Sequence, residues 1–178
     1  RLSPAARGAL VLRLESEAIA RLGERFVEAG PAAAFERAVA AMLACPGQVV
    51  VTGMGKAGVV GQKVSATLAS TGTPSFFLHP SEALHGDLGR LRPGDVVLAL
   101  SNSGETEEVN QVMAACRKLG NPLIGMTGRP DSTLGRHADH VLDIGRVEEA
   151  CPLKLAPTAS TTVIDRKSTR LNSSHTVI

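Results

Sequence analysis

Five short apolar runs, separated by loops and helical patterns, organise the middle of the chain. They span residues 48–52, 74–78, 95–100, 122–126 and 140–144, and helical patterns follow the first and the third run, at 59–70 and 105–119. Strands that alternate with helices form parallel sheets, and the right-handed crossovers place helices on both faces. We therefore expect an α/β fold: a three-layer sandwich around a five-stranded parallel sheet of the flavodoxin type.

The core has to be built almost entirely from aliphatic side chains. Only 2% of the 178 residues are aromatic, and the chain has neither Trp nor Tyr. Val, Leu and Ile suit a buried parallel sheet, whereas modules that stack nucleic-acid bases need aromatic rings. The 19 Lys and Arg residues are scattered and are nearly balanced by 17 Asp and Glu residues. We therefore expect neither a nucleic acid nor a membrane as a partner.

The cysteines point to a reducing environment. Cys45, Cys116 and Cys151 lie far apart and lack the CxxC spacing of a structural zinc site. An odd number of distant cysteines does not predict a disulfide framework. The cytoplasm is therefore the predicted location.

Both ends of the chain differ from the central pattern. Residues 9–29 repeat an apolar residue every four positions, and residues 32–44 continue as a second helical pattern after Gly30-Pro31. We expect residues 1–44 to form helices that pack on a domain spanning residues 45–164. Residues 165–178 are polar and aperiodic, so no helix or strand is predicted there.

A serine-rich loop after the third apolar run is the strongest candidate for an anion site. Ser101, Ser103 and Thr106 place three hydroxyls around Gly104, immediately before a predicted helix. Hydroxyls together with the unbonded N–H groups of a helix N-terminus form a site for phosphate. The alternative is ordinary helix capping by Ser103, which explains one hydroxyl better than three.

Two further loops follow apolar runs and carry candidate ligand groups. Residues 53–58 match G-x-G-x-x-G and contain Lys56. A dinucleotide site is the alternative there, but the next run ends at His79-Pro80 without the acidic residue that would bind the ribose. Lys56 is better suited to a phosphate or a developing oxyanion. Residues 156–162, which include Ser160, form either a second hydroxyl cup or a plain polar cap.

The motifs between residues 47 and 162 resemble those of the SIS (sugar isomerase) domain, and within it the D-arabinose-5-phosphate isomerases. The serine loop is typical of SIS domains in general. The narrower resemblance rests on STGTPSFFLHP, EALHGD and EACPL. It implies the interconversion of D-ribulose 5-phosphate and D-arabinose 5-phosphate through an enediol, in a homotetramer, without an organic cofactor. The product would feed the synthesis of a lipopolysaccharide sugar acid.

The resemblance also implies roles for individual residues. The implied catalytic set is Lys56, His85, Glu108 and Glu149. The implied substrate-binding set is Gly72, Thr73, Ser101, Ser103, Thr106 and Ser160. His79 matches a histidine that can take zinc, which we expect to be non-essential or inhibitory. We expect Glu149, with a pKa raised by a closed site, to be the base rather than Glu108, with Lys56 stabilising negative charge and His85 moving hydroxyl protons.

The chain departs from the family after Thr162. The family continues with a long Ala- and Leu-rich helix, a catalytic histidine in Ser-His-Pro-Gly-Gly, and a pair of CBS domains. Here the polar residues 165–178 follow, and His175 does not match that histidine motif. We expect this to be a truncated isomerase with a foreign end, exposed core surface and impaired turnover.

Two alternatives to an arabinose-5-phosphate isomerase stay open on the sequence. One is a sugar-phosphate sensor without catalysis, of the kind found in transcription regulators. Residues 9–44 lack the clustered basic residues that a DNA-binding bundle would need. The other is an SIS isomerase for a different sugar phosphate.

Overall fold

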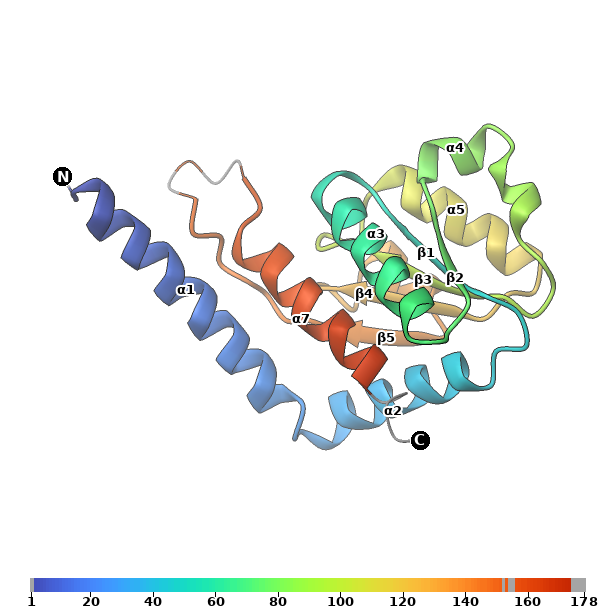
Figure 1. Ribbon diagram of the computed structural model, residues 1–178, viewed down its shortest axis with the longest axis horizontal. Helices are drawn as coiled ribbons and strands as arrows, with labels where there is room; N and C mark the ends of the chain where they lie inside the picture. Colours follow the sequence, from blue (N-terminus) through green and yellow to red (C-terminus); the bar gives the residue numbers. More distant parts are fainter. Residues whose placement is uncertain (1, 152, 154–155, 174–178) are drawn as a thin grey trace.

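The central unit is a five-stranded parallel sheet, as the alternating pattern predicts (Figure 1). The computed structural model describes residues 2–151, 153 and 156–173. The strands are β1 (Val49–Gly53), β2 (Ser75–Leu78), β3 (Val96–Leu100), β4 (Leu123–Thr127) and β5 (His140–Asp143). Their order in the sheet is β2-β1-β3-β4-β5, and all four pairings are parallel. This order is that of flavodoxin-like folds, so the expected fold class is confirmed.

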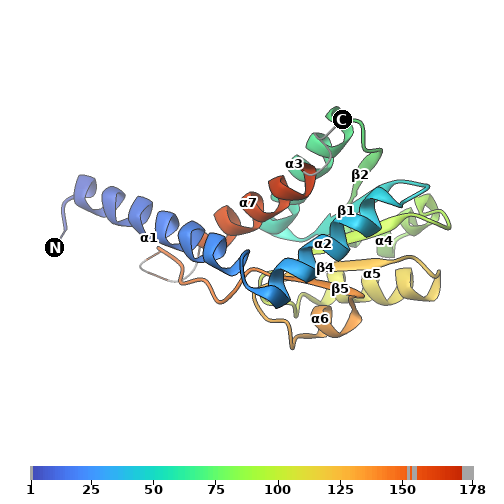
Figure 2. The same cartoon turned by 90° about the horizontal axis from the view of Figure 1, so that it is seen from below.

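Helices cover both faces of the sheet. They are α1 (Pro4–Arg25), α2 (Ala29–Leu43), α3 (Gly55–Ser70), α4 (Pro80–Leu84), α5 (Glu107–Lys118), α6 (Thr133–His137) and α7 (Ala159–Ser173), with a 3-10 turn η1 at Asp87–Arg90. In Figure 2, α3 and α7 lie on one side of the sheet, and α5 and α6 lie on the other. The short elements α4, η1 and α6 were not predicted, because four or five residues are too few to show a helical period.

Alternation along the strands divides the core between the two faces. In β3, Val96, Leu98 and Leu100 contact the cluster that includes α2, α3 and α7. Val97 and Ala99 contact the cluster that includes α5. All five side chains are at most 1% exposed. A strand buried on both faces reads as a continuous apolar run, which is why the runs could be located in the sequence.

The N-terminal helices pack on the sheet only in part. Helix α1 begins at Pro4, capped by the hydroxyl of Ser3, and extends away from the sheet toward its N-terminal end (Figure 1). Its buried side chains are Ala18 and Leu22, whereas residues 2–10 are exposed. Helix α1 already ends at Arg25, and Pro31 lies in the first turn of α2, where proline is tolerated. The predicted helix break at Gly30-Pro31 is therefore about five residues late.

The prediction that residues 165–178 contain no helix is wrong for 165–173. These residues continue α7, which packs against α1 and α3. Leu171 is fully buried, and so, unexpectedly, are Lys167 and Ser168, at 2% and 1% exposure. The Lys167 ammonium donates to the carbonyl of Asp143 at 2.7 Å, and the Ser168 hydroxyl donates to the carbonyl of Ile164 at 2.7 Å. Residues 174–178, including His175, lie outside the described residues.

Helix α7 covers the face of the sheet that we expected to be exposed, because no helix was predicted there from the sequence. Polar side chains satisfy their hydrogen bonds locally there, so a helix forms although its composition is polar. None of the helices in the described part of the chain is long and apolar enough to cross a membrane.

Candidate functional site

The strand order creates a topological switch between β1 and β3, where the chain turns from one half of the sheet to the other. Ligands of open α/β sheets bind at such a point, beyond the carboxyl ends of the strands. A cavity of about 280 Å³ lies there. Its lining residues come from the loops after β1 and β3 and from the start of α7: Met54, Lys56, Ala57, Leu100, Ser101, Asn102, Ser103, Thr106, Pro157, Ser160, Thr161 and Ile164.

This cavity, called the switch-point cavity below, brings together five of the eleven predicted site residues. Lys56, Ser101, Ser103, Thr106 and Ser160 all line it. They are up to 104 positions apart in the sequence, from Lys56 to Ser160. The two predicted hydroxyl cups therefore face one cavity rather than forming separate sites.

Hydrogen bonds within the serine loop fix its shape. The hydroxyls of Ser101 and Thr106 lie 2.9 Å apart, and the backbone N–H of Gly104 donates to the Ser101 hydroxyl at 3.1 Å. The Ser103 hydroxyl accepts from the N–H of Glu105 at 3.2 Å. Helix α5 begins only after Thr106, whose side chain makes no capping bond. Ser101 therefore shapes the loop, while Ser103 is exposed to solvent.

Lys56 reaches the cavity from the first turn of α3. The predicted glycine loop is shorter than expected, since α3 begins at Gly55. A Cβ at Gly58 would lie 2.5 Å from the carbonyl oxygen of Gly53, so this glycine is needed for the tight passage from β1 into α3. Within the described residues, no hydrogen bond or ion pair engages the Lys56 ammonium, and the side chain is exposed. It is available to an anion in the cavity.

Glu149 occupies a different position from the one expected of a base in a closed site. Its Oε2 accepts from the N–H of Thr158 at 2.7 Å, from the Thr158 hydroxyl at 2.9 Å and from the N–H of Ser160 at 3.4 Å. Burial raises the pKa of Glu149, but hydrogen bonds from Ser160 and Thr158 outweigh it and leave the pKa lowered. The expected raised pKa is thus not found, because the carboxylate caps the start of α7.

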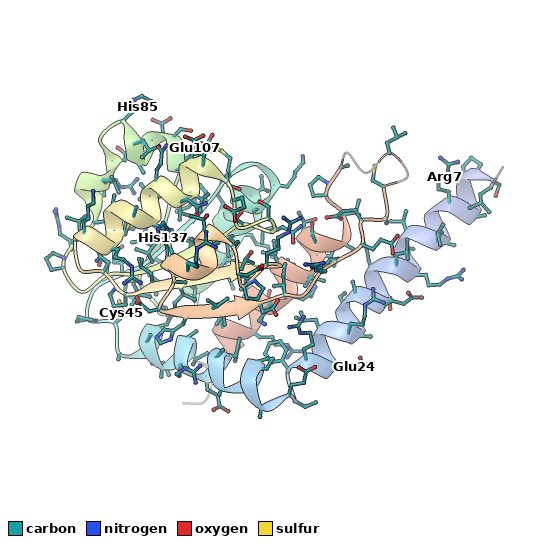
Figure 3. The ribbon with its side chains drawn as sticks, turned by 180° about the vertical axis from the view of Figure 1, so that it is seen from behind. Arg7, Glu24, Cys45, His85, Glu107 and His137 are labelled. Atoms are coloured by element: carbon teal, nitrogen blue, oxygen red, sulfur yellow. The ribbon has the colours of Figure 1, made fainter. Side chains whose placement is uncertain are left out.

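The other predicted catalytic residues do not line the switch-point cavity. Glu108 lies half-buried in the first turn of α5. His85 is exposed at the end of α4, and Figure 3 shows it at the edge of the molecule. Gly72 and Thr73 precede β2, at the amino edge of the sheet, beside a separate cavity of about 230 Å³. Their roles stay predictions.

His79 follows β2 and is half-buried. Its Nδ1 is buried without a hydrogen-bond partner. Among the described residues, however, no group of three His, Cys, Asp or Glu side chains could hold a metal ion. Within the described part of one chain, His79 therefore belongs to no group of three such ligands, and a zinc site would need further ligands from elsewhere.

Sequence reasoning missed three polar residues at the carboxyl edge of the sheet. Asn102 lines the switch-point cavity and also a neighbouring cavity of about 440 Å³, together with Arg129 and Arg146. Arg129 follows β4 and Arg146 follows β5. Their place directly after strands was the available signal, since post-strand loops carry the ligand groups in such folds.

Curated relatives match most of this chain. An arabinose 5-phosphate isomerase KdsD from Pseudomonas aeruginosa is 54% identical over 145 residues, which cover 82% of this chain and 42% of that protein. The protein of the same name from Escherichia coli K12 is 50% identical over 155 residues, which cover 87% of this chain and 46% of that protein. The chain thus spans less than half the length of these relatives.

A solved structure and a family model agree with these matches. An E. coli CFT073 protein solved in complex with A5P superposes with a TM-score of 0.82 at 37% identity, covering 93% of this chain and 87% of that one. The SIS domain model matches residues 42–164. This chain therefore belongs to the SIS domain family.

Proposed function

We propose that this chain is the sugar-phosphate-binding domain of an aldose–ketose isomerase that interconverts D-ribulose 5-phosphate and D-arabinose 5-phosphate. The observation that carries the proposal is the switch-point cavity, where Lys56 faces the hydroxyl loops at the starts of α5 and α7. Relatives that are 50% and 54% identical carry the name arabinose 5-phosphate isomerase, and a structural neighbour was solved with A5P. Together these support the enzyme over a sensor without catalysis.

The phosphate would be held by hydroxyls, backbone N–H groups and one cation. Ser103 and Thr106 supply hydroxyls before α5, and Ser160 and Thr161 supply them in the first turn of α7. Helix N-termini favour an anion, although Glu107 and Glu108 in the first turn of α5 already use part of that field. Lys56 therefore provides the positive charge that a dianionic phosphate needs.

The reaction moves one proton between the first two carbons of the sugar. A carboxylate removes the proton from C2 of the aldose, the electron pair forms the enediol double bond, and the carbonyl oxygen takes a proton. The O2 hydroxyl then gives up its proton, its electron pair forms the C2 carbonyl, and the electron pair of the enediol double bond takes the proton back from the carboxylic acid at C1, which gives the ketose. In this proposal Glu149 or Glu108 is the base, His85 exchanges the hydroxyl protons, and Lys56 stabilises the oxyanion.

Some of the proposed roles need more than one copy of the chain. His85, Gly72 and Thr73 do not line the switch-point cavity within the described part of one chain, and we propose that they reach its ligand from a second copy. This is consistent with the proposed homotetramer. We further propose a cytoplasmic protein without an organic cofactor, in which zinc at His79 is non-essential or inhibitory, and whose product supplies a lipopolysaccharide sugar acid.

A coupled isomerase assay tests the function. The chain and the corresponding full-length protein are each given ribulose 5-phosphate, fructose 6-phosphate or a hexulose 6-phosphate. Turnover restricted to ribulose 5-phosphate supports the proposal, and preferential turnover of a six-carbon substrate contradicts it. Binding of ribulose 5-phosphate without turnover by the full-length protein would favour a sensor.

A further inference from the structure

Two arginines that form no hydrogen bond or ion pair with the described residues lie beside the proposed phosphate site. Arg129 and Arg146 line a cavity of about 440 Å³ with Asn102, Ser103, Gly128 and Val147. This cavity, called the arginine cavity below, shares Asn102 and Ser103 with the switch-point cavity. The serine loop therefore lies between the two cavities, and Ser103 lines both of them.

Unlike Arg25 and Arg117, the two guanidinium groups have no bonded acceptor among the described residues. Arg25 forms an ion pair with Asp143, and Arg117 pairs with Asp139 at 2.8 Å. No such bond engages the side chain of Arg129 or Arg146 within the described residues, and both are exposed. None of the described residues that line the arginine cavity is acidic.

One carboxylate acts on Arg129 from outside the cavity. The pKa of Glu105 is lowered mainly by its hydrogen bonds from Thr133 and, more weakly, by Arg136 and Arg129. Glu105 is fully exposed and already accepts from the Thr133 N–H at 3.0 Å. The Glu105 carboxylate is therefore bound at the start of α6. The guanidinium of Arg129 remains able to bind another anion.

The loops that carry the arginines are held rigidly. The N–H of Gly128 donates to the carbonyl of Asn102 at 3.0 Å, and the N–H of Arg129 donates to the Thr127 hydroxyl at 3.1 Å. A Cβ at Gly128 would lie 2.8 Å from both the Asn102 Oδ1 and the Gly145 carbonyl oxygen. Three post-strand loops are thus packed in contact, so the backbone that positions the guanidiniums is preorganised.

We propose that Arg129 and Arg146 form a second anion subsite, which binds the second anionic group of a sugar phosphate that carries two. The ligand class is a sugar bisphosphate or a phosphorylated sugar acid, with one phosphate in the switch-point cavity. Arginine suits this role because its planar group binds phosphate and carboxylate oxygens in a bidentate manner. The inference rests on the proposed function, because both subsites share Ser103. Such a ligand would compete with the substrate.

Calorimetry with two probes tests the subsite. D-Ribulose 5-phosphate carries one phosphate and D-ribulose 1,5-bisphosphate carries two. We expect the unaltered chain to bind the bisphosphate at least about tenfold more tightly, the effect of one charge-assisted hydrogen bond. Arg129→Gln and Arg146→Gln should each reduce this ratio severalfold. Arg13→Gln, at an exposed arginine on α1, is the matched control and should leave it unchanged.

The outcomes separate the subsite from the function. An equal affinity for both probes, or a ratio that survives both substitutions, overturns the subsite and leaves the monophosphate site standing. If neither probe binds, the proposed function and the subsite both fail. Thermal melting of each variant verifies that the fold is intact, and competition between the bisphosphate and D-ribulose 5-phosphate tests whether both ligands occupy the switch-point cavity.

Discussion

Replacing Gly104 by alanine tests whether the serine loop depends on its close packing. Gly104 has φ 67°, in the left-handed region, and a Cβ there would overlap the hydroxyl of Ser132 and lie 2.9 Å from the Thr127 Oγ1. The Ser132 hydroxyl caps α6 by accepting from the N–H of Gly135 at 3.2 Å. The new methyl group therefore has to displace both the serine loop and the cap of α6.

Gly120 provides a matched control for the magnitude. Its φ is 79°, but a Cβ there meets no atom within 4 Å. Alanine at either position takes on a left-handed backbone, which costs about 1–2 kcal/mol. Only at Gly104 is overpacking added, which costs about 1–3 kcal/mol. We expect Gly104→Ala to lower the free energy of unfolding by about 2–5 kcal/mol and Gly120→Ala by about 1–2 kcal/mol.

Urea denaturation of the two variants measures this difference, and calorimetry with ribulose 5-phosphate measures the effect on the site. Gly104→Ala should also weaken binding, because the loop that holds Ser101 and Ser103 is displaced, whereas Gly120→Ala should bind normally. Equal destabilisation by the two substitutions would refute the packing argument. Normal binding by a folded Gly104→Ala variant would refute the link between this packing and the phosphate site.

Three further substitutions address charge and catalysis. Burial lowers the pKa of Lys167 to about 8 from 10.5. The unfolded state therefore binds more protons between these values, and stability should rise with pH across that window by up to about 3 kcal/mol. Burial also raises the pKa of Cys116 to about 11, which lowers stability as the pH rises above 9. The free energy of unfolding is therefore measured at pH 7.5 and 9.5 for both the chain and Lys167→Met, because their difference isolates the contribution of the lysine. The same pH dependence in both proteins would show that Lys167 is not buried. Glu149→Gln keeps an oxygen for the Thr158 bonds and should lower turnover of the full-length protein by about 100-fold or more if Glu149 is the base; near-normal turnover would assign that role elsewhere. Lys56→Met should lower turnover by roughly 100-fold through the loss of oxyanion stabilisation, and unchanged steady-state kinetics would exclude that role.

The strands and long helices were predictable because burial leaves a periodic record in the sequence. All five strands lie within one residue of their predicted bounds, since each apolar run is long enough to show both faces. Helix α6 was missed because its five residues show no period, although Ser132 caps it. The end of α7 was missed for a different reason: Lys167 and Ser168 are polar, and only their neighbours in the fold reveal that they are buried.

For the site, the chemistry of each loop was predictable from the sequence, but which loops meet at one cavity was not. The sequence by itself determined that Ser101, Ser103 and Gly104 follow a buried strand and precede a helix, because these features are local. It could not place Arg129 or Arg146 beside them.

Tertiary structure decided which loops meet. The order β2-β1-β3-β4-β5 puts β1 next to β3, which brings Lys56 to the serine loop although 44 residues lie between Lys56 and Ser101. The same order places the loops after β4 and β5 next to the serine loop at the carboxyl edge of the sheet, where they line the arginine cavity. The physical reason is that strand order is set by the packing of the crossover helices over the whole sheet, which no single segment records.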